Sequence, residues 1–323
     1  MKALQAGGTT VDQYGSAAAD LVDGRLDKRF GKGTHNNKDL YSDLHAKDRP
    51  TGVIATIKQN AILTAGDDID VRAREWMLGD ASTGAAGIGV YAGVGAAVAI
   101  MNVHSDTDAG VFGHLNAGDD TLVQATLQES TASRSLSGEI GIGAAGAAIG
   151  VVNESSEQSA RVAYGGWIES TDRLLVEADE ILAVDVMTGQ VSSGFLSMAA
   201  SISEIHDTGL TEAYLDDATI GPQLPSDSHD ICDPGLSQVR LALVRTDVDH
   251  DLTTNAGGIA SGVVAVGVTV SGVDDQHQMQ SWVGGGSTVV LQETLGVGGE
   301  STLNADTTLT TLTNGVVGVS VPR

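Results

Sequence analysis

The stretch 87–103 alternates branched aliphatic residues with small residues. Ile88, Val94 and Ile100 belong to the first set, and glycine and alanine make up most of the second. A period of two is the period of a β-strand, so the two sets face opposite sides of a sheet. We expect the aliphatic set to form the core face, and the second set to form a nearly bare face that another layer of protein approaches closely.

The same alternation returns along the chain. Its copies lie at 140–153, 194–204, 258–273 and 315–321. Asn153 follows Asn102 by 51 residues, at the same place in the motif. The chain therefore consists of repeats, each containing one Gly/Ala-rich strand.

Further motifs share this spacing. Ala-Gly-Asp-Asp precedes Val71 and Val123, and Val176 continues the same series at nearly the same interval. Short matching segments lie at 108–111, 159–162 and 212–215, and a later pair lies at 237–241 and 287–291. The last pair makes Val239 the expected counterpart of Val176.

A repeat of about 50 residues is typical of solenoids, propellers and arrays. A propeller blade needs four antiparallel strands with aromatic signatures, and aromatic residues make up only 3% of this chain. Parallel stacking instead places valine on valine and alanine on alanine in successive repeats. We therefore predict an all-β fold, a right-handed parallel β-helix (β-solenoid), with almost no helix after residue 50.

Composition divides the chain. Residues 1–50 hold eight Lys/Arg and seven Asp/Glu and are expected to form a polar arm or capping segment, whereas 51–323 form the repeat domain. The segment 221–235 contains three of the five prolines and makes the interval from Val176 to Val239 longer than the regular repeat. It is predicted to be an insertion loop, because proline cannot donate to a central ladder.

The charge limits the partners. The nine Lys/Arg and 35 Asp/Glu after residue 50 give that part a net charge of −26, which repels nucleic acid and anionic lipid.

The uncharged run 81–103 is long enough to span a membrane as a helix, yet its copies are too short, so we expect no transmembrane segment. The first residues lack the apolar stretch of a secretory signal. Cys232 is the only cysteine, which excludes an intrachain disulfide.

A resemblance rests on these motifs together. The Gly-h-Gly-h-Gly-Ala strand ending in Asn, the acidic segment after it and Ala-Gly-Asp-Asp-h-x-Val-x-Ala resemble the repeats of very large secreted bacterial exoproteins. These include filamentous-haemagglutinin-like adhesins and leukotoxin-type repeat proteins. The resemblance covers roughly 51–323 and implies a parallel β-helix with an extracellular or cell-surface location. It also implies structural or adhesive work, with a glycan or a host-cell surface as the target.

Acidic residues recur after the Gly/Ala-rich strands. The candidate metal ligands are Asp106, Asp108, Glu154, Glu157, Asp274 and Asp275. Repeats stacked about 4.8 Å apart would align these charges, which is costly unless water, salt or cations screen them. Calcium binds carboxylate oxygens. A calcium row and a hydrated acidic edge are therefore the two interpretations of this pattern.

No motif selects a catalytic site. The mixed acid–histidine clusters at 229–233 and 247–251 have no spacing that picks a metal, and exposed polar turns account for both. A β-helix polysaccharide lyase or glycosidase is the alternative function, but the many carboxylates single out no catalytic pair. We therefore expect a non-enzymatic protein without catalytic residues.

Self-association is the expected partner interaction. The strand from Val316 to Val321 begins a new copy of the motif without a polar cap, and an edge of this kind leaves backbone groups that pair with another chain. The Gly/Ala face offers a second surface. The expected interface residues are Gly87, Gly89, Gly93, Gly95, Gly141, Gly143, Gly146, Val316 and Val319. A homopolymeric filament and a piece cut from a longer array both explain these edges.

Overall fold

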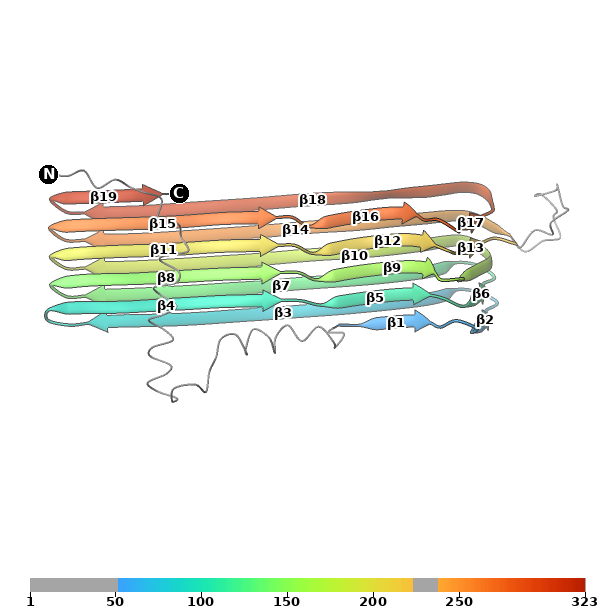
Figure 1. Ribbon diagram of the computed structural model, residues 1–323, viewed down its shortest axis with the longest axis horizontal. Coiled ribbons are helices and arrows are strands. Elements are labelled where there is room, and N and C mark those ends of the chain that lie inside the picture. The colour runs from blue at the N-terminus through green and yellow to red at the C-terminus, as the bar shows by residue number, and fades with distance from the viewer. Residues whose placement is uncertain (1–51, 223–237, 323) are drawn as a thin grey trace. The chain divides into compact units, whose positions relative to one another are not determined.

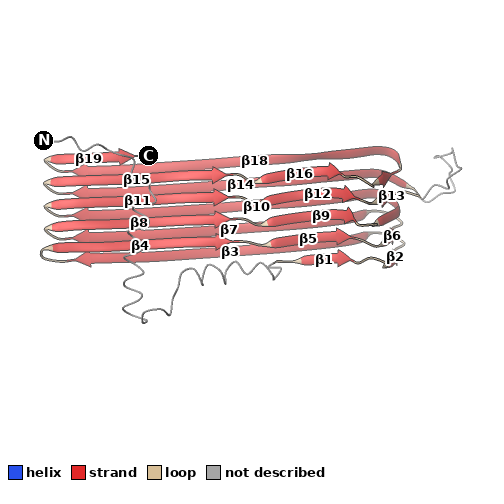
Figure 2. Ribbon diagram, in the orientation of Figure 1, coloured by secondary structure: helices blue, strands red, loops and turns tan. Residues whose placement is uncertain are grey.

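The computed structural model describes residues 52–222 and 238–322, and every regular element in these ranges is a β-strand (Figure 2). The chain divides into two units after Pro50, and the described residues belong to the second, Thr51–Arg323. The expected arm at 1–50 and residues 223–235 of the expected insertion lie outside the described residues.

The strands form three sheets, and every pairing in them is parallel. The Gly/Ala sheet contains β4 (Ala92–Val103), β8 (Gly143–Glu154), β11 (Leu196–Asp207), β15 (Val264–Asp275) and β19 (Val317–Pro322). The short-strand sheet contains β1 (Ile54–Ile57), β5 (Asp106–Val111), β9 (Glu157–Ala163), β12 (Leu210–Asp216) and β16 (Gln278–Val283). The long-strand sheet contains β3 (Ile69–Ile88), β7 (Thr121–Ile140), β10 (Trp167–Ser193), β14 (Val239–Ser261) and β18 (Leu291–Asn314), together with the edge strands β2 (Ile62–Thr64), β6 (His114–Asn116), β13 (Thr219–Ile220) and β17 (Thr288–Val289).

The chain visits the three sheets in a fixed order. After β3, a turn at 89–91 reverses the chain into β4, and β5 continues in the same direction after a short break (Figure 1). The chain then passes through β6 and returns along β7, which pairs with β3. Each strand therefore pairs with its counterpart in the next repeat, and the all-β, parallel part of the prediction is confirmed.

The register confirms most of the alignments expected from the sequence. Val71 pairs with Val123 and Val123 with Val176, while Asn102 pairs with Asn153. The Asn153 side-chain amide donates to Asn102 Oδ1 over 2.7 Å, so the repeated asparagine links neighbouring repeats.

Two expected alignments near the insertion are wrong. Val176 pairs with Val244, whereas Val239 pairs with Thr171. Val239 also pairs with Leu291, although the match between 237–241 and 287–291 placed it opposite Val289. The reason is that β10, β14 and β18 are paired along nearly the whole length of β14, and these long ladders set the register in place of a short local motif.

The two faces of the Gly/Ala strands are opposite to the expectation. Val94 and Ile100 are 49% and 54% exposed, whereas Ala97 and Ala99 are only 3% exposed. The aliphatic set therefore points outward, and the small residues face the long-strand sheet. The sequence pattern identified the strand correctly but assigned its core face wrongly.

Hydrogen bonds between the two layers explain the small inward residues. Ser135 Oγ of β7 donates to the Ala97 carbonyl of β4 over 2.7 Å, and Ser192 Oγ of β10 donates to the Ala144 carbonyl of β8 over 3.0 Å. Hydroxyl groups are short, so they reach a backbone carbonyl in the opposite layer only if little side-chain volume lies between the layers. Glycine and alanine provide this separation.

Beneath most of the short-strand sheet the interior is apolar. Val123, Val176 and Val244 are stacked in register and fully buried, and they pack with buried alanines such as Ala160 and Ala213 of the facing strands. Repeated valines and alanines thus form one continuous core through the repeats.

The turns that lead into the Gly/Ala strands stack through glycine. The Gly194 amide donates to the Ser261 carbonyl over 2.9 Å, and the Gly262 amide donates to the Asn314 carbonyl over 2.9 Å. A Cβ atom added to Gly262 would lie closer than 3.0 Å to the Gly194 carbonyl oxygen, and Gly194 stands in the same relation to Gly141. Each turn therefore lies directly against the backbone of the preceding turn.

Candidate functional site

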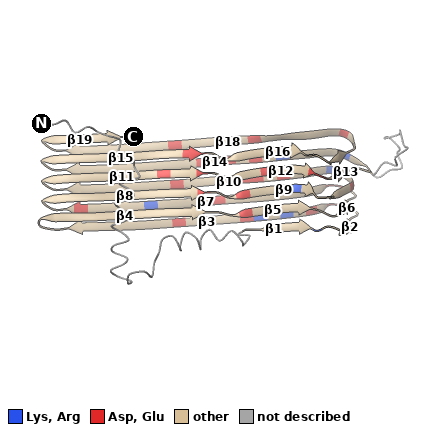
Figure 3. Ribbon diagram, viewed as in Figure 1, with Lys and Arg blue, Asp and Glu red and all other residues tan. Residues whose placement is uncertain are grey.

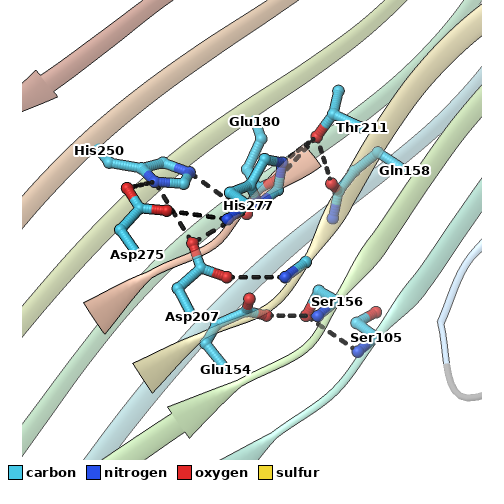
Figure 4. A network of polar contacts seen from close by, with 11 residues as sticks. Ser105, Glu154, Ser156, Gln158, Glu180, Asp207, Thr211, His250, Asp275 and His277 are labelled. Atoms are coloured by element: carbon cyan, nitrogen blue, oxygen red, sulfur yellow. Dashed lines mark hydrogen bonds and ion pairs between the residues drawn. The ribbon is translucent and has the colours of Figure 1, made fainter. Parts of the chain in front are cut away.

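A buried polar cluster lies where the Gly/Ala strands end and the short strands begin (Figure 4). The long-strand sheet contributes Glu180 from β10 and His250 from β14. The facing layer contributes Asp207, Asp275 and His277, of which the first two end β11 and β15. The cluster thus joins the two layers in neighbouring repeats.

Glu180 lies at the centre of the cluster with a fully buried side chain. Its Oε2 accepts a hydrogen bond from Thr211 Oγ1 over 2.8 Å and lies 3.2 Å from His277 Nε2. Its Oε1 lies 3.8 Å from His250 Nε2. Both imidazoles therefore present Nε2 to the same carboxylate.

The other nitrogen of each imidazole faces an aspartate. His250 Nδ1 lies 3.3 Å from an oxygen of Asp275 and 3.3 Å from an oxygen of Asp207. His277 Nδ1 lies 3.5 Å from Asp207 Oδ2. The two rings meet edge to face with centroids 4.8 Å apart. Each histidine is thus held between carboxylates on both sides.

Backbone amides fix the orientation of both aspartates. The Gly209 amide donates to Asp207 Oδ1 over 2.8 Å, and the His277 amide donates to Asp275 Oδ1 over 3.0 Å. The remaining oxygen of each aspartate is then directed toward the imidazoles (Figure 4).

Burial and mutual charge control the protonation of the cluster. Burial raises the pKa of Glu180, although both histidines oppose this shift. Burial raises the pKa of Glu154, and a hydrogen bond shared with Asp207 raises it further, so Glu154 holds the proton of this pair. Burial by itself would lower the pKa of His250, but the hydrogen bond to Asp275 and the charges of Glu180 and Asp207 raise it overall.

A further carboxylate extends this row of buried acids. Burial raises the pKa of Glu129 on β7 to about 7, and the charges of Glu180 and Asp207 act in the same direction. Burial and the repulsion between neighbouring carboxylates therefore raise the pKa of Glu129, Glu154 and Glu180 above the ordinary range of a carboxyl group.

The six candidate calcium ligands lie in separate places. Glu154 and Asp275 point inward and belong to the buried cluster. They contact different residues there: Asp275 contacts His250, and Glu154 contacts Ser156. Asp274 faces outward, 3.8 Å from His206. Asp106, Asp108 and Glu157 lie on adjacent strands of the short-strand sheet, where Asp108 is paired with Arg161 over 2.6 Å. The six residues do not form one site, and the calcium expectation stays a prediction.

Most of the glycines expected at an interface do not lie on an exposed face of the Gly/Ala sheet. Gly87, Gly93 and Gly95 are buried, so they offer no surface to a second chain. Gly146 faces inward, and a Cβ atom there would meet the Glu139 carboxylate. Gly89 and Gly141 are at turns, and Gly143 begins β8 on its outward face. Val316 and Val319 are exposed.

The sequence did not identify the two histidines of this cluster as site residues. His250 belongs to the acidic segment 247–251, which was expected to be an exposed turn, but it lies inside strand β14. Along β14 the buried residues alternate with exposed ones, so His250 points inward while Asp249 and Asp251 point outward. The alternation was a usable signal, because His250 lies an even number of positions from the buried Val244 and Leu252.

The cluster does not resemble a glycosidase site. Two hydrolytic carboxylates must face a cleft that admits a sugar, whereas Glu180, Asp207 and His250 are at most 2% exposed. The arrangement can hold protons or an ion between the two layers.

A second feature is the outward face of the Gly/Ala sheet. Its apolar residues are Val94, Val98, Ile100, Ile149, Val151, Leu196, Met198, Ile202, Val264, Val266, Val268, Val270, Val317, Val319 and Val321, all at least partly exposed. Acidic residues occur in these strands only toward their carboxyl-terminal ends, and the strands are uncharged along most of their length (Figure 3). We call this surface the valine face.

Comparison with protein families, with curated proteins and with solved structures finds no match to this chain. Within residues 52–222 and 238–322, no helix has the length and apolar character needed to cross a membrane.

Proposed function

We propose that the repeat domain is a right-handed parallel β-helix that serves as a non-enzymatic structural or adhesive module of a bacterial cell surface. The observation that carries the proposal is the valine face, a flat apolar surface on strands that repeat in register. Large exposed apolar patches mark interaction surfaces. The resemblance to repeats of large secreted exoproteins supports the location.

A second copy of this chain is the partner that fits the valine face. Four of its strands have 12 residues and the fifth has six, which corresponds to about 850 Å² of sheet at the usual strand rise and spacing. Two copies face to face would bury roughly 1,700 Å² in total, the size of a stable protein interface. The strongly acidic protein would then associate through the surface that carries the least charge, which minimises repulsion.

The replacement of two central valine-face residues tests this proposal. We expect Met198→Glu with Val266→Glu to convert a self-associating protein into a monomer, because two apposed copies would bury four unpaired carboxylates. Sedimentation velocity over a range of protein concentrations measures the change, with circular dichroism as the test of folding.

The matched control places the same two charges on the opposite outward surface. Thr253→Glu with Asn255→Glu on β14 should leave the association unchanged. A wild-type protein that is folded and monomeric at the highest concentration would contradict the proposal. So would equal association of the two double variants.

A further inference from the structure

The acid–histidine cluster contains groups whose hydrogen-bonding capacity is unused. Glu180 Oε1 and His250 Nε2 have no hydrogen-bond partner among the described residues, and their side chains are 0% and 2% exposed. These two atoms face each other across 3.8 Å. A buried polar atom without a partner costs free energy, so two such atoms aimed at one point indicate a missing ligand.

From this geometry we propose that Glu180, His250 and His277 bind one divalent transition-metal ion between the two layers. The oxygen and the two nitrogens that they offer lie within 4.8 Å of one another. Two imidazoles and one carboxylate suit zinc, iron, manganese, cobalt or nickel, whereas calcium prefers oxygen ligands alone. The ion would be structural, since all three side chains are buried.

The separations favour a metal over a simple ion pair. Around a tetrahedral ion with bonds of about 2.0–2.1 Å, neighbouring ligand atoms are about 3.4 Å apart. Glu180 Oε2 lies 3.2 Å from His277 Nε2 and Glu180 Oε1 lies 3.8 Å from His250 Nε2, and these two distances bracket this value. A direct charge-assisted hydrogen bond would be about 2.7–2.9 Å long.

The surrounding residues orient the ligands as supporting residues do in metal sites. Asp275 lies 3.3 Å from His250 Nδ1, and Asp207 lies 3.5 Å from His277 Nδ1. A carboxylate at Nδ1 holds the proton there and leaves the Nε2 lone pair for a metal. At His277 the ion would replace the Thr211 hydroxyl, whose Oγ1 lies 3.0 Å from Nε2. Thr211 fixes Glu180 Oε2 over 2.8 Å, so Oε2 faces His277 Nε2 and Oε1 faces His250 Nε2.

Zinc and cobalt binding to the full chain test the proposal. After incubation with zinc and removal of excess metal, elemental analysis should find one tightly held equivalent per chain. Its removal by a strong chelator at constant ionic strength should lower the melting temperature by about 5 °C or more. Cobalt should give the visible absorption bands of a tetrahedral site.

A double histidine variant tests whether these two histidines are the metal ligands. His250→Asn with His277→Asn should lose the tight equivalent and weaken the binding at least tenfold. The control, His206→Asn, changes a partly exposed histidine beside Glu204 and should keep it. If the double variant does not fold, Glu180→Gln replaces it, and the cobalt spectrum of the wild-type protein decides independently of either variant. A wild-type chain that retains less than about a tenth of an equivalent when zinc, ferrous iron, manganese, cobalt and nickel are tried in turn would overturn the proposal. Equal metal binding by the variants and the control would also overturn it.

Discussion

Gly262→Ala is expected to destabilise the protein by about 3 kcal/mol, the upper part of the usual range for overpacking, or to unfold it. The new Cβ atom would lie closer than 3.0 Å to the carbonyl oxygen of Gly194 in the preceding turn. The obstacle is backbone and not the end of a flexible side chain, so the two repeats would have to separate. The Gly262 amide donates to the Asn314 carbonyl as well, and any shift of this turn weakens that hydrogen bond. Urea denaturation followed by circular dichroism measures the loss.

The matched control lies in the same repeat. Gly272 is on β15, and a Cβ atom there would meet no atom within 4 Å. Gly272→Ala should be neutral or slightly stabilising, because alanine restricts the unfolded chain more than glycine does. Equal urea midpoints for the two variants would show that the turns do not depend on close backbone approach.

Glu139→Gln is expected to stabilise the protein at pH 8 and to have little effect at pH 4. The Glu139 side chain is buried beside Gly95 and Gly146, and burial raises its pKa above the ordinary 4.5. Hydrogen bonds from Gln190, over 2.6 Å, and from Ser137 oppose this shift without cancelling it. Glutamine keeps the shape of the side chain and can still accept from Gln190.

The sign of the effect follows from proton binding. Above pH 4.5 the unfolded chain releases the Glu139 proton while the folded chain retains it, so stability falls as the pH rises and levels off above the pKa of the folded state. Each unit of pKa displacement corresponds to about 1.4 kcal/mol. The variant removes this contribution, so its advantage should be largest at pH 8.

Denaturant unfolding at several pH values measures the difference between the two proteins. Glu157→Gln makes the same chemical change at an exposed position and is the control. A stabilisation by Glu139→Gln that is the same at pH 4 and pH 8 would contradict the assignment of a buried, titrating carboxyl group.

Much of the fold was predictable because the motifs recur at a regular spacing in the sequence. The spacing of Val71, Val123 and Val176 predicted the pairing of β3, β7 and β10 residue by residue. The alternation after Gly87 predicted strands, but it carried no information on which face is inside. Which face of the Gly/Ala strands is buried depends on the serines of the opposite layer, such as Ser135, because they require a small residue across the interior.

The site was much harder to predict than the fold. The site combines residues that are far apart in the sequence, namely Glu180, Asp207, His250 and His277. The insertion lengthens the interval between paired residues of β10 and β14 and of β11 and β15, so His250 and His277 do not follow the regular repeat spacing. The sequence did indicate recurrent acids after the Gly/Ala strands. It could not show that Glu154, Asp207 and Asp275 point inward, because the strand directions are fixed by the pairing of the whole layer.

The uniform offset between paired strands has a consequence for how the domain folds. Outside the insertion, each residue pairs with its counterpart one repeat further along, so every new repeat closes a loop of nearly the same length. The entropic cost of adding a repeat is therefore nearly constant along the chain. A completed repeat presents a ready edge to the next one, and the slow event is the formation of the first pair of repeats. Folding should thus proceed by growth from a nucleus, one repeat at a time.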